Sequence, residues 1–444
     1  MQESASTIVA CATGKTRAGV SIVRISGSLA CQITEKVTLK PVPLARVATN
    51  RKFLNREKTL IDKGLVIFFP APHSYTGEDV VELHTHGSPF IVDTLIREVI
   101  AHGGEQAKPG EFSERAFLSG KMDLLQAEAV CDLIQAQTQQ QARAACASLQ
   151  GVFSKRVHAC ANELEAIRIQ LEASIDFADQ DPETSSWHII LEKLNSLITE
   201  LEKLIQDAQR GVHTQAGIHV VLVGRPNVGK SSLLNRLTQS DTAIVTDTPG
   251  TTRDTIEATI SHQGQLIRVT DTAGLRKESM DPIEAIGMEK TRKVLEHADC
   301  IWLLVDCRDC NKKIQNTLDE LIPETHKPKC SVVANKIDLI EGALNADMSA
   351  ISAETGAGID QLLHKTLTQC DLSESVSFSA RARHIDALEN MHEKLISAKA
   401  HQQHEPELIA ENLRYAQEDL GKILGTYYPD DLLDAIFRSF CLGK

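Results

Sequence analysis

One stretch near the middle of the chain constrains the fold more than any other. Residues 224–232 read Gly-Arg-Pro-Asn-Val-Gly-Lys-Ser-Ser and match the phosphate-binding pattern G-x-x-x-x-G-K-[ST]. Residues 219–223 before it are mostly apolar and β-branched, which predicts a buried strand. After it, Leu233, Leu234 and Leu237 fall at helical spacing. Strand, glycine-rich turn and helix form the context of a nucleotide site, whereas a turn without a ligand is the alternative.

The residue types in this stretch match what a bound phosphate and its Mg²⁺ require. Gly224 and Gly229 allow backbone N–H groups and the helix N-terminus to face the anion closely. Lys230 is expected to reach the β- and γ-phosphates, and the Ser231 hydroxyl is the predicted Mg²⁺ ligand. We therefore expect an α/β P-loop domain.

Two later motifs identify the base as guanine. Residues 335–338 read Asn-Lys-Ile-Asp after an apolar run, and the Asp338 carboxylate can accept both N–H groups on the edge of guanine. Adenine has no such donor pair, so a buried carboxylate there rejects the wrong base strongly. Ser352 and Ala353 follow a short strand-like segment and predict the companion loop over the base. GTP is therefore expected in preference to ATP.

The segments between these motifs are predicted to contain the loops that respond to the γ-phosphate. Asp271 ends a strand-like run and begins Asp-Thr-Ala-Gly, which places an acid near Mg²⁺ and Gly274 near the γ-phosphate. Thr252, in a threonine-rich loop, is the candidate second Mg²⁺ ligand. Leu275 stands where many GTPases carry a water-positioning glutamine. Glu284 is the acidic candidate for that work, and a solvated loop carboxylate is the alternative interpretation.

Length, composition and charge limit what the rest of the chain does. A length of 444 residues is typical of about three domains. No apolar run approaches the roughly 20 residues that span a bilayer, and no secretory signal is evident, so we expect a cytoplasmic protein with no membrane partner. The net charge of −13 argues against bulk attraction to nucleic acid, so any RNA contact needs a local basic patch.

Cysteines and histidines give no strong metal signal. The 11 cysteines lack disulfide-scaffold spacing, which is consistent with a reducing compartment. Cys307 and Cys310 form a lone Cys-x-x-Cys, for which a loop after a strand is favoured over a metal or redox role. His84 and His86 share a strand face, and paired surface or ligand-pocket histidines are the favoured interpretation.

Periodicity divides the chain into three domains and predicts a multidomain fold. Residues 1–118 combine strand-like runs with turn-rich loops and predict an α+β domain. Residues 119–212 and 376–444 carry apolar residues at intervals of three and four, which predicts two halves of one all-α helical domain. Residues 213–375 form the GTPase domain, so the simplest architecture inserts it between the helical halves.

Motifs outside the GTPase pattern are far more specific than the P-loop itself. They are Ser-Tyr-Thr-Gly-Glu-Asp-Val-Val-Glu-Leu-His at 74–84, Pro-Gly-Glu-Phe-Ser-Glu-Arg-Ala-Phe-Leu at 109–118, Lys-Met-Asp-Leu at 121–124, Gln-Ala-Glu-Ala at 126–129 and Phe-Cys-Leu-Gly-Lys at 440–444. With these motifs the chain resembles, over essentially its whole length, the MnmE (TrmE) family of GTPases that modify the wobble uridine of tRNA.

The resemblance implies a tetrahydrofolate site in the N-terminal domain, which also forms a homodimer. The matching positions are Arg24, Glu82, Lys121 and the terminal Lys444, and 5-formyl- or methylene-tetrahydrofolate is the expected one-carbon donor. A carboxylate suits a pterin ring and cations suit a glutamate tail, whereas surface ion pairs are the plain alternative. Cys441 matches a family cysteine proposed to act in the chemistry, where a thiol with a lowered pKa can serve as a nucleophile.

The resemblance also implies that K⁺ takes the place of an arginine finger during hydrolysis. Asn227, Thr246, Thr248 and Thr251 match the potassium ligands and their loop, and Glu284 stands in Glu-Ala-Ile-Gly, which matches the family's water-orienting glutamate. With the family motifs, the expected GTP contacts are Asn227, Val228, Gly229, Lys230, Ser231, Ser232, Thr246, Asp247, Thr248, Pro249, Gly250, Thr251, Thr252, Asp271, Thr272, Ala273, Gly274, Asn335, Lys336, Asp338, Ser352 and Ala353.

The implied function is a potassium-activated GTPase that works with a flavin-dependent partner, MnmG, which carries the FAD in a heterotetramer. Together they would install an aminomethyl or carboxymethylaminomethyl group at C5 of the wobble uridine, with carbon from the folate and nitrogen from glycine or ammonium. A ribosome-assembly GTPase without modification chemistry is the rival, and a folate-dependent aminomethyl carrier with a regulatory GTPase is a third possibility. Arg381 and Arg383 are basic candidates for tRNA contact, with a solvated helix start as the alternative.

The chain departs from the family pattern at one N-terminal segment. Residues 12–19 read Ala-Thr-Gly-Lys-Thr-Arg-Ala-Gly, whereas Ala-Thr-Pro-Pro-Gly-Arg-Gly-Gly is usual in the family. The folate contacts of the loop from Gly14 to Ala18 therefore stay open.

Overall fold

The computed structural model describes most of the chain, with gaps. The described residues are 6–14, 16–176, 185–239, 257–271, 294–309, 314–340, 348–372, 376–401 and 405–425, with Leu433, residues 436–438, Phe440 and Gly443 near the C-terminus. They form two compact units. One comprises Met1–Cys131 with Arg414–Lys444, and the other comprises Asp132–Leu413.

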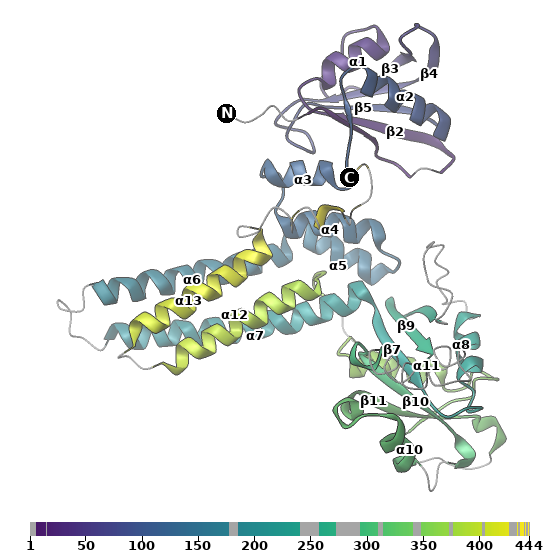
Figure 1. Ribbon diagram of the computed structural model, residues 1–444, viewed down its shortest axis with the longest axis vertical. Coiled ribbons are helices and arrows are strands. Elements are labelled where there is room, and N and C mark those ends of the chain that lie inside the picture. Colours follow the sequence, from purple (N-terminus) through teal and green to yellow (C-terminus); the bar gives the residue numbers. More distant parts are fainter. Residues whose placement is uncertain are drawn as a thin grey trace, which may run out of the picture. The chain divides into compact units, whose positions relative to one another are not determined.

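A six-stranded mixed sheet organises the N-terminal part of the first unit (Figure 1). Its strand order is β3-β4-β5-β2-β1-β6, and all neighbouring pairs are antiparallel except β1 with β6. The strands are β1 (Ile8–Cys11), β2 (Ala18–Ser26), β3 (Thr49–Leu54), β4 (Leu60–Phe69), β5 (Val80–Gly87) and β6 (Glu105–Gln106). Helices α1 (Ala30–Thr38) and α2 (Pro89–Ala101) pack on one face, and α3 (Glu111–Leu118) follows β6.

Alternation along the strands assigns side chains to the two faces of this sheet. Val23 and Ile25 of β2 are fully buried in the core beneath α1 and α2. Arg24 lies between them in sequence, so its side chain points to the opposite face, where Ile8 and Phe112 form a smaller apolar cluster. The opposite face therefore carries a cation beside apolar and aromatic groups.

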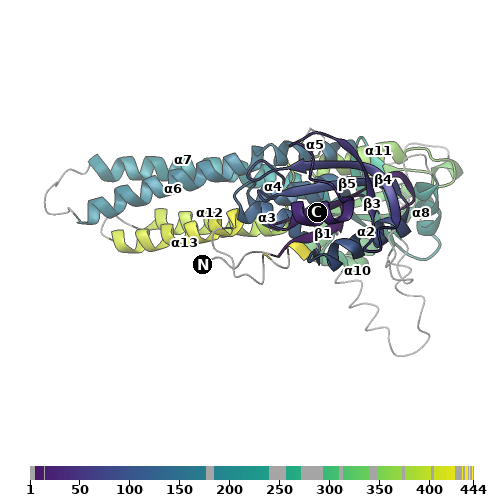
Figure 2. The same ribbon diagram turned by 90° about the horizontal axis from the view of Figure 1, so that it is seen from above.

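Long helices make up much of the rest of the chain. They are α4 (Leu124–Gln135), α5 (Gln139–Leu149), α6 (Val152–Asp176), α7 (Ser185–Ala216), α12 (Ala382–Ala400) and α13 (Pro406–Leu424). In the second unit, α6 and α12 both pack against α7, and Figures 1 and 2 show these helices side by side. A capping box between Thr138 and Gln141 begins α5, since each side chain bonds the other residue's backbone N–H.

The chain returns to the helices through a short, tightly packed segment before α12. Phe378 is fully buried, and its ring stacks on Phe153 of α6 with 4.4 Å between centroids. Next to it, Ser379 Oγ donates to Asp132 Oδ2 at 3.0 Å, and its backbone N–H donates to Ser148 Oγ at 2.9 Å. The helices before and after residues 218–369 thus share one buried contact region, as expected if that segment is inserted between them.

The inserted segment folds as a second six-stranded sheet, of order β12-β11-β10-β7-β9-β8. All pairs are parallel except β8 with β9, and each face of the sheet has its own apolar core. The strands are β7 (Ile218–Val223), β8 (Glu257–His262), β9 (Gln265–Asp271), β10 (Cys300–Asp306), β11 (Cys330–Asn335) and β12 (Ser349–Ala350). The helices are α8 (Lys230–Thr238), α10 (Ile314–Leu321) and α11 (Ile359–Gln369), with 3₁₀ turns at Cys307–Asp309, Glu324–Lys329 and Ile337–Leu339.

The expected multidomain fold class is confirmed by these elements. The run at 219–223 forms β7, and the helical stripes before and after the insertion form α6, α7, α12 and α13. Strand β3 was not expected from the sequence. None of the helices in the described ranges has both the length and the apolar character to cross a bilayer.

Candidate functional site

The P-loop follows the carboxyl end of β7, a central strand of the second sheet. Lys230 begins α8, so the predicted strand, turn and helix are all present. Gly229 has a φ of 101°, which favours glycine, and a Cβ there would collide with Asn335 Nδ2. This close approach explains why the turn needs glycine, and it leaves the backbone N–H groups open to an anion.

Lys230 is held inside the turn rather than extended into solvent. It is 8% exposed, and its Nζ donates to Gly224 O at 2.7 Å and to Arg225 O at 3.0 Å. The ammonium group therefore already sits over the loop that would enclose phosphates. Ser231 and Ser232 are exposed in the first turn of α8, where a hydroxyl can meet Mg²⁺. These residues fit a nucleotide phosphate.

The base end of the site is joined directly to the P-loop by Asn335. This residue is 1% exposed and ends β11. Its Nδ2 donates to Val228 O at 2.9 Å, and its Oδ1 accepts from the Ala353 N–H at 2.9 Å. One buried side chain thus fixes the P-loop, the Asn-Lys-x-Asp motif and the Ser352–Ala353 loop relative to one another.

Asp338, which the sequence predicts to recognise the guanine edge, lies in the 3₁₀ turn that follows β11. Its Oδ1 accepts a hydrogen bond from Ser352 Oγ, and Ser352 is fully buried. The Ser352 hydroxyl therefore orients the carboxylate, and the second carboxylate oxygen remains an acceptor for a base. Asp271 is 1% exposed at the end of β9, and its register partner is Leu222 of β7, so it ends beside the strand that leads into the P-loop.

Sequence reasoning missed Asp306, which belongs to the same site. Lys336 Nζ lies 2.8 Å from Asp306 Oδ2 and donates to Asn227 O at 2.9 Å. The Arg308 guanidinium beside Asp306 holds the pKa of that carboxyl well below its usual range, and Lys336 adds to the effect. The signal that could have found Asp306 is its place at the carboxyl end of a parallel strand beside β7.

The structure describes Cys307, the first cysteine of the Cys-x-x-Cys motif, but not Cys310, the second. Cys307 is 5% exposed, and its Sγ donates to Lys336 O at 3.0 Å, while burial raises the pKa of its thiol. This thiol therefore supports the turn at Lys336, whose φ is 68°. Cys310 lies outside the described residues, so the pair as a unit is not tested.

Several predicted residues also lie outside the described residues, and their assignments stay predictions. They are Thr246, Asp247, Thr248, Pro249, Gly250, Thr251, Thr252, Thr272, Ala273, Gly274, Leu275, Glu284, Cys441 and Lys444.

In the first unit, Arg24 and Glu82 form an ion pair across neighbouring strands. They are register partners on β2 and β5, and Arg24 Nη2 lies 3.0 Å from Glu82 Oε1. His84 Nε2 lies 3.3 Å from Glu82 Oε2, whereas the exposed His86 pairs with Asp62. Two of the four residues expected to contact folate are therefore in direct contact, and His84 belongs to the same group.

Arg24 retains one buried nitrogen that has no hydrogen-bond partner. This atom is Nη1, and none of the described residues accepts from it. The guanidinium lies over two aromatic rings, with its central carbon 5.3 Å from the Tyr75 ring centre and 5.6 Å from that of Phe112. A buried donor without an acceptor is costly, so this face fits a ligand that supplies one.

The loop that carries Tyr75 is anchored to α3 by residues of the family motifs. Tyr75 Oη and Ser113 Oγ lie 2.8 Å apart, and Arg115 Nη1 lies 3.1 Å from Glu78 Oε1. Ser26 Oγ donates to Glu78 Oε2 at 2.6 Å, which ties the same loop to β2. The sequence signalled these motifs, but their anchoring role emerges only from the fold.

Of the two remaining folate candidates, the structure describes Lys121 but not Lys444. Lys121 is exposed, and its stem passes Gly77 of the same loop, where a Cβ would lie 3.5 Å from its Cε. Gly443 packs against the Cys11 carbonyl at the end of β1, where any Cβ would collide. Gly443 thus lies close to β1, the strand that neighbours β2.

Comparisons with known proteins show the family to which the chain belongs. A family model described as the MnmE helical domain matches residues 124–441, and one described as the GTP-binding protein TrmE N-terminus matches residues 7–121. A protein of Xanthomonas campestris pv. campestris (strain B100), named tRNA modification GTPase MnmE, is 45% identical over 452 residues, with 100% of each chain covered. This chain belongs to the MnmE family. A Pseudomonas aeruginosa (strain UCBPP-PA14) member with the same name is 44% identical over 463 residues, again with 100% of each chain covered.

Solved structures that resemble this MnmE-family chain match it only in part. The G domain of the T. maritima FeoB iron transporter is 24% identical and covers 34% of this chain and 98% of its own, with a TM-score of 0.26. A variant of Aquifex aeolicus Era bound to GDP and an aluminium fluoride is 25% identical and covers 42% of this chain and 69% of its own, with a TM-score of 0.28. These TM-scores are too low to carry an argument.

Proposed function

We propose that this chain hydrolyses GTP to GDP and phosphate in order to drive tRNA modification. With a flavin-dependent partner, MnmG, it would install an aminomethyl or carboxymethylaminomethyl group at C5 of the wobble uridine. The observation that carries the proposal is the presence, in one chain, of a guanine-type P-loop site and of a second polar site, where a buried arginine nitrogen has no partner among the described residues.

At the GTP site, different residues would recognise the base, position the loops and bind the phosphates and Mg²⁺. Asp338 would accept both N–H groups of guanine, while Asn335 holds the two loops that enclose the nucleotide. Lys230 would exchange its backbone carbonyl partners for phosphate oxygens, which costs little because the ammonium already lies inside the turn. Ser231 and Thr252 would hold Mg²⁺, which neutralises charge on the phosphate oxygens.

We assign water positioning to Glu284, because Leu275 cannot orient water. The change Glu284→Ala should reduce GTP turnover by at least about a hundredfold, since general-base and positioning groups typically contribute that much. Affinity for GTP should stay near that of the wild type. Turnover and nucleotide affinity are measured on the same preparations, and unchanged turnover would remove Glu284 from the mechanism.

We assign K⁺ binding to Asn227, Thr246, Thr248 and Thr251, which would place a cation near the charge that develops on the phosphates. Replacing K⁺ by Na⁺ should slow hydrolysis, because the larger ion matches the expected ligand cage. The change Asn227→Ala should remove this preference, and Asn235→Ala on α8 serves as a control. Equal hydrolysis rates in both salts would contradict the role of K⁺.

We assign tetrahydrofolate binding to Arg24, Glu82, Lys121 and Lys444. Arg24 Nη1 has no partner among the described residues, and a pterin ring offers acceptors while its amine nitrogens suit Glu82. The change Arg24→Ala should weaken 5-formyl-tetrahydrofolate binding by at least about tenfold in calorimetry. Arg56→Ala, whose side chain is 64% exposed, should leave it unchanged. Equal affinities of both variants would contradict the assignment.

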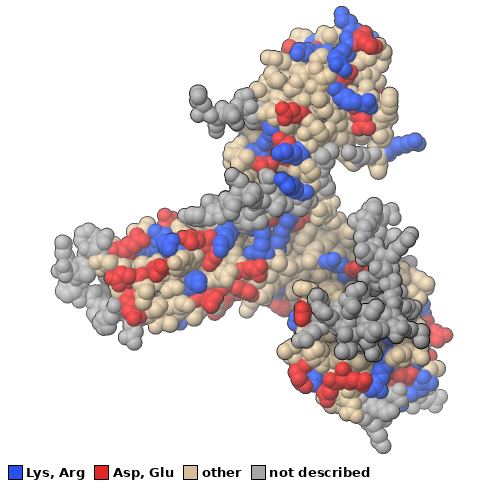
Figure 3. Space-filling model, in the orientation of Figure 1, with Lys and Arg blue, Asp and Glu red and all other residues tan. Residues whose placement is uncertain are grey.

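Other parts of the proposal rest on the family alone. They are the homodimer, the heterotetramer with MnmG and the nucleophilic role of Cys441. The cytoplasmic location and the domain boundaries at residues 118, 212 and 375 rest on the sequence patterns described above. Arg381 is a poor candidate for tRNA docking, because its guanidinium pairs with the Asp132 carboxylate at 3.0 Å. Asp132 is only 4% exposed. On the face that Figure 3 shows, acidic side chains are interspersed with basic ones over the long helices, so this face presents no purely basic patch for RNA.

A further inference from the structure

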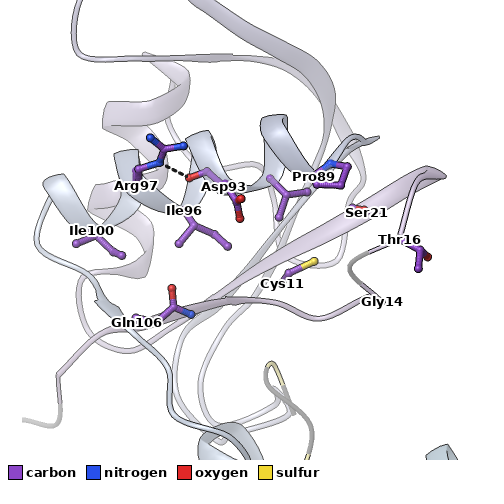
Figure 4. A pocket seen from close by; sticks show the side chains of 11 residues that line it. Cys11, Gly14, Thr16, Ser21, Pro89, Asp93, Ile96, Arg97, Ile100 and Gln106 are labelled. Carbon is purple, nitrogen blue, oxygen red and sulfur yellow. Dashed lines mark hydrogen bonds between the residues drawn. The ribbon is translucent and has the colours of Figure 1, made fainter. Parts of the chain in front are cut away.

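A cavity of about 580 Å³ lies between α2 and the sheet of the first unit (Figure 4). Cys11 lines it, and Cys11 pairs in register with Val23, whereas its neighbour Ala10 pairs with Arg24. Because side chains alternate along a strand, Cys11 and Arg24 point to opposite faces of the sheet. The cavity is therefore separate from the Arg24–Glu82 site.

The floor of the cavity is apolar and buried. Val92 and Ile96 of α2 are 6% and 9% exposed, and Cys11 opposite them is 3% exposed. Such apolar walls can pack against the carbon skeleton of an organic ligand, but they offer few polar groups to an inorganic ion. The cavity volume lies within the usual range for small-molecule sites, about 300–1,000 Å³.

The hydroxyl of Ser21 is open to this cavity. Ser21 of β2 is 2% exposed as a whole residue and lines the cavity, and within the described ranges its Oγ is not enclosed by protein. The hydroxyl can therefore bond water or a ligand atom that enters the cavity. Figure 4 places Ser21 at the end of the cavity near Pro89, where a ligand atom could pair with it.

Two opposite charges line the cavity on successive turns of α2. The Nε of Arg97 donates to the backbone oxygen of Asp93 at 3.2 Å, as Figure 4 shows. Within the described ranges, no ion pair engages either the Arg97 guanidinium or the Asp93 carboxylate. Among the described lining residues, Arg97 offers a cation to a single carboxylate, while Asp93 one turn away disfavours a ligand with several negative charges, such as a nucleotide.

We propose that this cavity binds an elongated organic monoanion. Its apolar body lies along Val92 and Ile96, its carboxylate meets Arg97, and a hydrogen-bonding group at its other end meets Ser21. Pro89 and Arg97 are eight positions apart, which spans about 12 Å along a helix and sets the ligand length. Gly14 and Thr16 form part of the wall, and they lie in the segment where this chain departs from the family pattern.

Methyl NMR of the full-length chain with labelled isoleucines tests the proposal, with indole-3-propionate as the probe. The methyl signals of Ile96 and Ile100 should shift and saturate. Arg97→Gln should weaken binding by at least about tenfold and Ser21→Ala by roughly threefold to tenfold, the usual costs of losing a charged and a neutral hydrogen bond. Tryptamine, which replaces the carboxylate with a cation, should bind at least about tenfold more weakly. Arg56→Gln is the matched control and should change nothing.

Three results would overturn the proposal. They are the absence of shifts at Ile96 and Ile100 at millimolar probe, equal affinity for tryptamine, and shifts centred on Ile22, which shares the face of Arg24. The cavity does not depend on the folate assignment, and the two can fail separately. Arg24→Ala should leave indole-3-propionate binding intact, and Arg97→Gln should leave 5-formyl-tetrahydrofolate binding intact.

Discussion

At the residue scale, the base end of the GTP site is assembled from side chains that hold one another in place. Asn335 bonds the P-loop and the Ala353 backbone, Ser352 orients Asp338, and Lys336 bridges Asn227 and Asp306. Each of these contacts joins segments that are far apart in sequence. We therefore propose that base selectivity depends on this network rather than on the Asn-Lys-x-Asp motif alone.

The change Asp338→Asn should shift base preference from guanine to xanthine. An amide presents an N–H group where guanine also donates, while xanthine offers a carbonyl oxygen there. We expect GTP affinity to fall by about a hundredfold or more and xanthosine triphosphate to bind more tightly than GTP. Competition binding with the two nucleotides measures this, and a variant that still prefers GTP would refute the assignment of Asp338.

Asp306 gives a pH prediction whose sign follows from its lowered pKa. The stability it supplies is complete above the pKa of an unfolded aspartate, about 3.9, and is lost as pH falls through the lower folded value. The stability difference between wild type and Asp306→Asn should therefore be constant from about pH 5 to about pH 8 and shrink below about pH 4. Urea unfolding followed by tryptophan fluorescence measures it, since Trp302 lies in the same strand. A difference that already shrinks between about pH 7 and about pH 5 would implicate a histidine instead.

At the element scale, strong local patterns predicted their elements and weak ones did not. The apolar run at 219–223 and the leucine stripe through Leu197, Leu201 and Leu204 appear as β7 and α7. Strand β3 was missed because its sequence, Thr-Asn-Arg-Lys-Phe-Leu, buries only Phe53 and gains its strand structure from pairing with β4.

The role of a residue in the candidate sites was predictable only where a known sequence motif assigns that role to its position. Asn335 and Asp338 follow from the sequence, because their spacing relative to the P-loop is characteristic of guanine sites. Asp306 and Tyr75 do not, because their partners Lys336 and Ser113 lie about 30 to 40 positions away and meet them only after folding. Tertiary contacts of this kind leave no local signal.

A substitution in the segment that joins the insertion to α12 should strongly lower the free energy of unfolding. Phe378→Ala removes a fully buried ring that stacks on Phe153, so we expect a loss of about 3–5 kcal/mol of unfolding free energy. Phe90→Ala is the matched control, since Phe90 is 74% exposed and should cost less than about 0.5 kcal/mol. Chemical denaturation of both variants compares the two losses. Similar losses would mean that the Phe153–Phe378 contact does not stabilise the helices.

At the scale of the whole molecule, the two proposed sites lie in different compact units of one chain. Arg24 and Glu82 belong to the first unit, while Lys230, Asn335 and Asp338 belong to the second. Binding at each site should therefore survive the loss of the other. Arg24→Ala should retain wild-type GTP affinity, and Asp338→Asn should retain wild-type affinity for 5-formyl-tetrahydrofolate.

Calorimetric titration of each variant with both ligands tests this independence. Loss of both binding activities from either single change would show that the variant is unfolded or that the sites form one unit.

We propose that one chain couples a guanine-nucleotide site to chemistry on the wobble uridine. Nucleoside mass spectrometry of tRNA tests this coupling, in cells that lack the chain and in the same cells supplied with wild type, Arg24→Ala or Asp338→Asn. We expect the aminomethyl-type modification at C5 of the wobble uridine to disappear in the deletion strain and to return only with the wild-type chain. An unaltered wobble uridine in the deletion strain would contradict it.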